Sequence, residues 1–283
     1  MRADRRAIEL PPNLVRTITK EGPGGAEWIA ELPRLLAECA EQWSLDLEEP
    51  FDAAFSLVVP AGDVVLKLNP RGDPEPEHEG DALERWNGRG AVRLLAHDRE
   101  RWALLIERCR PGTQLWALPD EEATELAADV LEQLWIPAHE PFRRLADEAA
   151  RWAEELPNRP LERALVDRAV AFLREAGPTQ RESVLLHQDF HGANVLLSDR
   201  GWLAIDAKPL VGEREFAVAP IVRSFELGHG RRDVEHRFER LVSELGLDRE
   251  RARGWTIAQT LAWAFDSHYR VRHLETAKWV LEA

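Results

Sequence analysis

The chain has 283 residues, of which 44% are hydrophobic and 31% charged, and its formal net charge is -14 at pH 7. Such an acidic surface repels nucleic acid, and no apolar run approaches the roughly 20 residues of a membrane helix. We therefore expect neither a nucleic acid nor a membrane partner, and no protein partner is predicted. Two cysteines and the lack of an apolar leader are typical of a cytoplasmic protein.

The first part of the chain predicts a small lobe built on an antiparallel sheet. Apolar residues at helical spacing alternate with strand-like runs, and the short turn "PAGD" at 60–63 joins two of these runs into a hairpin. Gly88 and Gly90 end the helix before the second hairpin. The predicted elements are a helix at 31–43, strands at 51–59 and 63–69, a helix at 77–90, and strands at 91–98 and 101–109.

The second part of the chain is mostly helical after Pro111 and Gly112 break the pattern. A section at 185–209 interrupts the helices with three short strands. We expect an α+β fold with an N-terminal lobe at 1–108, a hinge near 107–112 and a larger, mainly helical lobe at 109–283. The predicted helices of that lobe lie at 120–136, 140–156, 160–176, 215–229, 231–245 and 248–281.

The stretch "HQDFHGAN" at 187–194 carries polar side chains of unusual density between two strand-like segments. On an extended strand, His187, Asp189 and His191 would point to one face. Such a face could hold zinc or another transition metal for hydrolysis. A metal-dependent hydrolase is therefore one interpretation of the stretch.

A second interpretation uses the oxygen donors. The turn "SDRG" at 198–201 folds the strand that ends at Asp206 back beside "NVLL", which brings Asn194 and Asp206 near each other. Hard oxygen ligands of this kind suit Mg²⁺ bound to phosphate oxygens. Asp189 is then left to meet a substrate hydroxyl as the catalytic base.

The second interpretation requires a cation for nucleotide phosphates, and the chain supplies one. Lysine occurs only four times, and Lys67 lies inside the apolar run "VVLKL". A buried lysine is costly unless it is paired, and Glu79 in the following helix is a candidate partner. Since the hydrolase interpretation leaves Lys67, Asn194 and Asp206 unexplained, we favour a kinase.

These motifs resemble the streptomycin 6-kinase/hydroxyurea phosphotransferase family, in the aminoglycoside phosphotransferase branch of the protein-kinase-like superfamily. The resemblance rests on "VLKL", "HEGDALERWNGRGAVRLLAHD", "RWALLIERCRPG", "HQDFHGANVLL" and "WLAIDAKPLVGEREF", in the right order over roughly 60 to 220. It implies a bilobal protein-kinase-like fold with a small antiparallel-sheet lobe and a larger helical lobe. It also implies an enzyme that uses ATP and Mg²⁺.

The resemblance assigns a role to each matched residue. Lys67 would hold the α- and β-phosphates with Glu79 orienting it, Asp189 would be the catalytic base, and Asn194 and Asp206 would bind Mg²⁺. The residues that would offer backbone groups to adenine are Glu107, Arg108, Cys109 and Arg110. His187 would brace the loop, His191 would touch substrate or pack, and Lys208 would meet a phosphate or neutralise nearby carboxylates.

Two features depart from protein kinases. "FDAAFS" at 51–56 contains no glycine where a glycine-rich loop covers the phosphates, and "IDAK" at 205–208 replaces Asp-Phe-Gly. The second departure matches small-molecule kinases and suggests no activation-loop switch.

The expected substrate is a small, cationic molecule, since guanidinium groups of an aminoglycoside such as streptomycin pair well with carboxylates. The predicted activity is transfer of the γ-phosphate of ATP to a hydroxyl of that substrate. The alternative acceptors are hydroxyurea or a different small hydroxylated metabolite. The alternative from another class of protein is a non-catalytic nucleotide-binding protein. Candidate substrate contacts are Glu213, Glu215, Glu226 and Asp266, with Trp255, Trp263 and Tyr269 either walling the pocket or forming core.

Overall fold

The computed structural model describes residues 8–21, 24–264 and 269–283. The chain divides into two compact units: unit 1 contains residues 1–88 and 92–109, and unit 2 contains residues 89–91 and 110–283. Within the described ranges, no helix combines the length and apolar character that a membrane crossing requires. The lobe boundary and hinge that the sequence suggests stay predictions.

Unit 1 is built on an antiparallel sheet with strand order β1-β2-β4-β3. The two-residue loop of Gly62 and Asp63 joins β1 to β2, and Gly62 has a φ of 63°, which glycine adopts without steric cost. The first strand begins at Leu57, so the strand expected at 51–59 is shorter at its start. The strands are β1 (Leu57–Ala61), β2 (Val64–Leu68), β3 (Leu94–Asp98) and β4 (Ala103–Glu107).

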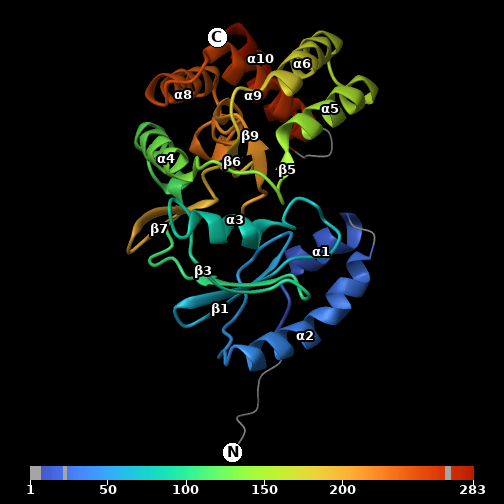
Figure 1. Cartoon of the computed structure of the whole chain (residues 1–283), viewed down its shortest axis with the longest axis vertical. Coiled ribbons are helices and arrows are strands. Elements are labelled where there is room, and N and C mark those ends of the chain that lie inside the picture. The colour runs from blue at the N-terminus through green and yellow to red at the C-terminus, as the bar shows by residue number, and fades with distance from the viewer. Residues whose placement is uncertain (1–7, 22–23, 265–268) are drawn as a thin grey trace, which may run out of the picture. The chain divides into compact units, whose positions relative to one another are not determined.

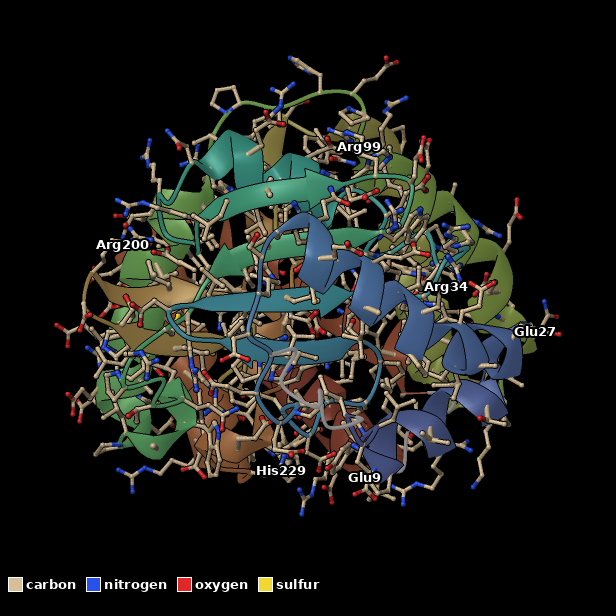
Figure 2. All side chains as sticks on the ribbon, turned by 90° about the horizontal axis from the view of Figure 1, so that it is seen from below. Glu9, Glu27, Arg34, Arg99, Arg200 and His229 are labelled. Atoms are coloured by element: carbon tan, nitrogen blue, oxygen red, sulfur yellow. The ribbon has the colours of Figure 1, made fainter. Side chains whose placement is uncertain are left out.

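Helices cover both faces of this sheet, with α2 and α3 on opposite sides (Figure 1). The helices are α1 (Pro12–Glu21), α2 (Gly25–Gln42) and α3 (Glu79–Trp86), of which the sequence did not predict α1. Charged residues such as Glu27 and Arg34 occupy the exposed side of α2 (Figure 2). Its buried side, including Leu32 and Leu35, packs with Leu57 and Leu66 of the sheet into one apolar core.

The alternation of β2 decides where Lys67 points. Leu66 and Leu68 belong to the core that α1 and α2 close. Because successive side chains of a strand point to opposite faces, Lys67 faces the other side of the sheet, where α3 lies (Figure 1). The side chain of Lys67 therefore points from β2 toward Glu79 in the first turn of α3.

Unit 2 contains helices and short strands. Its helices are α4 (Asp120–Leu134), α5 (Leu145–Glu155), α6 (Arg163–Ala176), α7 (Ala219–Val222), α8 (Arg231–Glu244), α9 (Arg249–Trp263) and α10 (Arg270–Glu282), with single 3-10 turns at Leu115–Ala117, Leu156–Asn158, Gly177–Thr179, Arg214–Phe216 and Phe225–Leu227. Its strands are β5 (Arg143–Arg144), β6 (Val184–Leu186), β7 (Val195–Ser198), β8 (Gly201–Ala204) and β9 (Leu210–Gly212). The three strands expected in 185–209 are β6, β7 and β8, and they are confirmed.

Two of the helix predictions for unit 2 were wrong. The segment 215–229 is two 3-10 turns and the one-turn α7. In place of one helix over 248–281 the structure has α9 and α10, which pack against each other. Nearly all of α9 from Ala252 to Ala262 is buried. A helix that is buried on all sides has no alternation of apolar and polar residues, so the sequence pattern did not indicate where α9 ends.

Candidate active site

In unit 1 the ammonium group of Lys67 lies 2.7 Å and 2.6 Å from the two carboxylate oxygens of Glu79. Both residues are buried, with exposed fractions of 3% and 1%. Asn69 donates to the same carboxylate at 3.0 Å, and the Ser56 hydroxyl donates to Asn69 at 2.6 Å. The pair that the sequence suggested is therefore formed, and a polar chain from Ser56 to Lys67 compensates its burial.

The start of α3, which carries Glu79, is fixed by a second set of contacts. His78 lies 2.8 Å from the Asp81 carboxylate, and Arg99 of the β3–β4 loop binds its other oxygen. Burial alone would raise the pKa of Asp81, but the hydrogen bonds of Arg99 and His78 outweigh it and lower that pKa. A Cβ atom at Gly80 would stand 2.5 Å from the His97 ring, so any larger residue at this position would require that ring to move.

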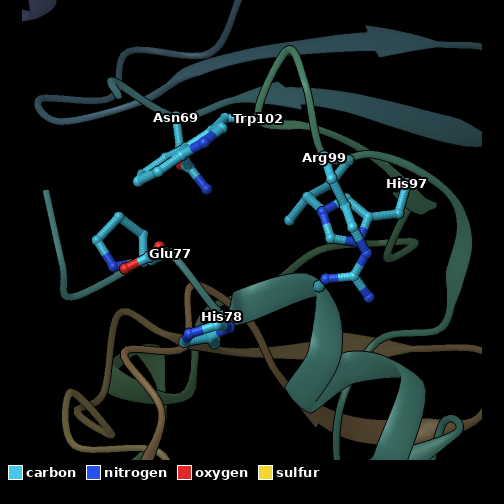
Figure 3. A pocket seen from close by; sticks show the side chains of 9 residues that line it. Asn69, Glu77, His78, His97, Arg99 and Trp102 are labelled. Carbon is cyan, nitrogen blue, oxygen red and sulfur yellow. The ribbon is translucent and has the colours of Figure 1, made fainter. Parts of the chain in front are cut away.

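A cavity of about 120 Å³ opens beside this helix start. Figure 3 shows Asn69 and Trp102 together, with His97 and Arg99 across from them. Since Asn69 also binds Glu79, the cavity wall and the Lys67–Glu79 pair share one side chain.

The segment expected to contact adenine has part of its polar groups committed within unit 1. The Glu107 amide donates to the Arg93 carbonyl at 3.1 Å, and the Arg108 amide donates to the Asp63 carbonyl at 2.9 Å. The Arg108 guanidinium binds Glu48 at 2.9 Å. Contact of Glu107, Arg108 and Cys109 with a nucleotide stays a prediction.

In unit 2 the loop at 187–194 follows the buried strand β6 and begins at a buried histidine. The Nε2 atom of His187 lies 2.9 Å from the Ile205 carbonyl, so that nitrogen donates. Burial lowers the pKa of His187 to about 4, and the ring is neutral at pH 7. The His187 carbonyl accepts from the amides of Asp189 at 2.8 Å and Lys208 at 3.0 Å. This residue braces the loop from within.

Two residues of the candidate site have a left-handed backbone although neither is glycine. Gln188 has a φ of 63° and Asp206 a φ of 61°. A conformation of this kind costs about 1–3 kcal/mol and persists only where neighbours enforce it. At Gln188 the side chain of Gln259 donates to its carbonyl at 2.9 Å, and Arg143 donates to its side-chain oxygen at 2.8 Å. The contacts on Gln188 set the direction in which the next residue leaves the loop.

That next residue, Asp189, has a side chain that is 14% exposed and surrounded by basic groups. Lys208 Nζ lies 3.6 Å from Oδ2, while Arg223 Nη2 and His191 Nε2 each lie 3.9 Å from Oδ1. Burial alone would raise the pKa of Asp189, but its basic neighbours, with Lys208 as the largest influence, outweigh burial and lower the pKa to about 2. Asp189 is therefore a carboxylate at neutral pH.

Asn194 and Asp206 stand at the open end of the β7–β8 hairpin. Val195 pairs with Ala204, and the Ile205 amide donates to the Asn194 carbonyl at 3.0 Å, so the hairpin joins the two positions as expected. Asn194 donates its side-chain Nδ2 to the Asp189 carbonyl at 3.0 Å, so its amide oxygen is the atom that could bind a cation. An amide and a carboxylate oxygen are suitable donors for Mg²⁺.

His191 connects the loop to the segment after α7. Its Nδ1 accepts from the Ala193 amide at 3.3 Å and lies 3.6 Å from Glu226 Oε1. Ser224 donates to Glu226 at 2.8 Å and accepts from the Gly192 amide at 3.0 Å. Glu226 is thus near the loop, as the sequence allowed.

Other candidate substrate contacts lie elsewhere. Glu213 has no exposed surface, and its carboxylate binds Arg251 at 2.7 Å and the Trp255 indole N–H. A carboxylate satisfied in this way is not open to a substrate, and Trp255 is core, so the suggestion that Glu213 contacts substrate is corrected. Asp266 lies outside the described residues. Lys208 keeps both options that the sequence left open.

The sequence did not indicate Arg223 or Gln259. It did suggest Trp263 as a pocket wall or a core residue, but not its contact with Arg223. Arg223 is one of many arginines among 37 basic residues, and it lies 34 positions after Asp189, so no local spacing marks it. Gln259 belongs to a helix buried on nearly all sides, where no pattern distinguishes one polar residue.

Known structures place this architecture in the protein-kinase-like fold. Choline kinase LicA from Streptococcus pneumoniae matches with a TM-score of 0.65 and 13% identity, over 89% of this chain and all of that one. A thermostable mutant of aminoglycoside phosphotransferase APH(4)-Ia, in a complex with ADP and hygromycin B, matches with a TM-score of 0.55 and 17% identity, over 87% of this chain and 95% of that one. The expected α+β fold is confirmed.

Sequence relatives then define the family. Streptomycin 6-kinase of Streptomyces griseus is 35% identical over 90% of this chain and 89% of its own length. Hydroxyurea phosphotransferase of Kitasatospora aureofaciens is 36% identical over 90% and 78%. The profile of the aminoglycoside/hydroxyurea antibiotic resistance kinases matches residues 46–271, and the chain belongs to this family of phosphotransferases.

Proposed function

We propose that the protein transfers the γ-phosphate of ATP to a hydroxyl of a streptomycin-like aminoglycoside. The observation that carries the proposal is Asp189, a carboxylate held among basic groups on a braced loop. The names of the relatives support the acceptor class. The net charge of -14 also favours a cationic acceptor over an anionic one.

The residues of each unit have distinct tasks in this proposal. Lys67, oriented by Glu79, binds nucleotide phosphates, and the amide oxygen of Asn194 with the Asp206 carboxylate holds Mg²⁺. When bound, Mg²⁺ neutralises phosphate charge and fixes the phosphate oxygens. Glu107 to Cys109 contact adenine.

Asp189 accepts a hydrogen bond from the acceptor hydroxyl and orients its oxygen. The new bond joins that oxygen to the γ-phosphorus as the bond to the β–γ bridging oxygen breaks, and ADP leaves. The hydroxyl proton passes to Asp189 and then to solvent. With a pKa of about 2, Asp189 is a weak base. A weak base is sufficient when little proton transfer has occurred in the transition state and the main task of the carboxylate is to position the acceptor hydroxyl.

The test is ATP consumption in a coupled assay with streptomycin, hydroxyurea, choline and other small hydroxylated acceptors. Mass and NMR spectra of the product then identify the phosphorylated oxygen. Turnover with streptomycin that the Asp189→Asn variant loses is the expected result. Turnover with hydroxyurea or another metabolite alone would replace the acceptor, and nucleotide binding with no turnover would indicate a non-catalytic protein.

A further inference from the structure

Arg223 follows the one-turn helix α7 and has a buried guanidinium group. Its exposed fraction is 8%. The guanidinium carbon lies 4.4 Å from the centre of the Trp263 ring, and Nη2 lies 3.9 Å from Asp189 Oδ1. One arginine thus contacts both an indole face and the candidate catalytic carboxylate.

Lys208 approaches the same carboxylate from its other oxygen. Its Nζ lies 3.6 Å from Asp189 Oδ2 and 4.9 Å from the same Trp263 ring. Trp263 therefore supports two cations, and each oxygen of Asp189 faces one of them.

Neither distance is short enough for a normal hydrogen bond, which spans about 2.7–3.2 Å. The cations therefore attract the carboxylate without occupying the lone pairs that an acceptor hydroxyl needs. A planar, weakly hydrated guanidinium stacks well on an aromatic ring, which keeps Arg223 in place while it makes so long an ion pair.

A phosphoryl group brought to Asp189 carries the same sign of charge as the carboxylate, and the two repel. Positive charge fixed beside the carboxylate offsets this repulsion without any rearrangement during the reaction. Arg223 is buried, so its charge is poorly screened by salt.

We infer that Arg223, stacked on Trp263, is a positioning residue for phosphoryl transfer that holds the Asp189 carboxylate in place and leaves its oxygens open to the acceptor. The inference rests on the proposed function, because it assumes that Asp189 receives the acceptor hydroxyl. Loss of the Arg223 charge should therefore lower turnover and leave substrate binding nearly unchanged.

Three variants of Arg223 test the role. Arg223→Ala removes the charge and leaves a space on the indole, Arg223→Met removes the charge but fills the space, and Arg223→Lys keeps a charge. The alanine and methionine variants should lose about 100-fold in kcat with the KM values for ATP and acceptor nearly unchanged. The lysine variant should retain more turnover than the methionine variant.

Chemical rescue separates positioning from packing. Guanidinium chloride at tens of millimolar should restore about tenfold in kcat to the alanine variant, since the free ion can stack on Trp263. It should restore nothing to the methionine variant, and ammonium chloride at the same concentration should restore neither. Should Arg223→Ala fail to fold, the comparison of the methionine and lysine variants decides the question.

Arg214 supplies the matched control. It also stacks on an indole, at 5.4 Å from the Trp135 ring centre, and binds the Glu182 carboxylate at 2.6 Å. Arg214→Ala should keep wild-type kcat and ignore guanidinium. The inference would be overturned if the Arg223→Met variant kept the kcat of the unmodified protein or differed from it only in KM. Turnover by the unmodified protein would still support the proposed function in that case.

A crystal structure of Arg223→Met gives a second readout that needs no acceptor. We expect the Asp189 carboxylate to turn relative to the wild type. If the wild-type protein phosphorylates no acceptor, the proposed function fails, and a carboxylate that keeps its orientation in the variant would then overturn the inference as well.

Discussion

Gln259 donates its side-chain amide to the carbonyl oxygen of Gln188 at 2.9 Å, and both residues are fully buried. Gln188 has a left-handed backbone, and Asp189 follows it directly. Through this hydrogen bond, α9 helps to fix the backbone that orients the candidate catalytic residue. Gln259→Leu should destabilise the protein by about 1–3 kcal/mol, because a buried carbonyl loses its donor, and it should lower kcat.

Glycine at position 188 tests whether backbone conformation carries this effect. Glycine adopts a positive φ without penalty, so Gln259→Leu should cost less in a Gln188→Gly background. Urea unfolding and kcat of the four proteins form a double-variant cycle. Effects that simply add would show that the contact does not hold the backbone.

The Lys67–Glu79 pair predicts an asymmetry between single and double variants. Lys67→Met leaves the buried Glu79 carboxylate without its main cation and should destabilise the protein by about 3–5 kcal/mol. Lys67→Met combined with Glu79→Leu should recover part of that loss, although neither protein should bind ATP normally. Urea unfolding and ATP titration measure the two properties, and equal stability of both variants would contradict the argument.

Asp189→Asn keeps the shape of the side chain but removes its charge. We expect kcat to fall by about 10²–10⁴-fold while nucleotide still binds, because a neutral amide cannot take up the proton of the acceptor hydroxyl. Calorimetric titration with a non-hydrolysable ATP analogue measures binding separately. Turnover near wild type would exclude Asp189 as the base.

Asp206→Asn tests the proposed Mg²⁺ ligand without disturbing the backbone, since asparagine tolerates a left-handed φ. ATP affinity in the wild type should rise with Mg²⁺, and the variant should lose most of that rise. The titration is run with and without Mg²⁺. An unchanged response would remove Asp206 from the ligand set.

Folding stability should depend on pH through His187. The folded pKa is about 4 and the ordinary value is 6.5, so between these pH values the unfolded state binds the proton that the folded state excludes. Stability should therefore fall as pH drops from about 6.5 towards 4, by up to about 3 kcal/mol. Urea unfolding of His187→Gln should show a weaker dependence of stability on pH. Part of the dependence should remain, because burial also lowers the pKa of His273 to about 3.

The parts of the site that follow from short sequence distances could be predicted, and the rest could not. A hairpin of a few residues places Asn194 beside Asp206, and a lone lysine in an apolar strand indicates a buried partner. Arg223 and Gln259 reach the loop only through the packing of distant helices. The pattern of carboxylates was misleading at Glu213, because a charge on a helical lobe can be satisfied inside it.

The scarcity of lysine gives the protein a useful chemical label. Only Lys20, Lys67, Lys208 and Lys278 carry side-chain amines, and two of the four belong to the candidate site. A mild acylating reagent followed by peptide mass spectrometry should modify exposed Lys20 and Lys278 first and buried Lys67 last. The Lys208 side chain is 23% exposed, so its acylation rate reports directly on whatever comes to occupy the space around Asp189.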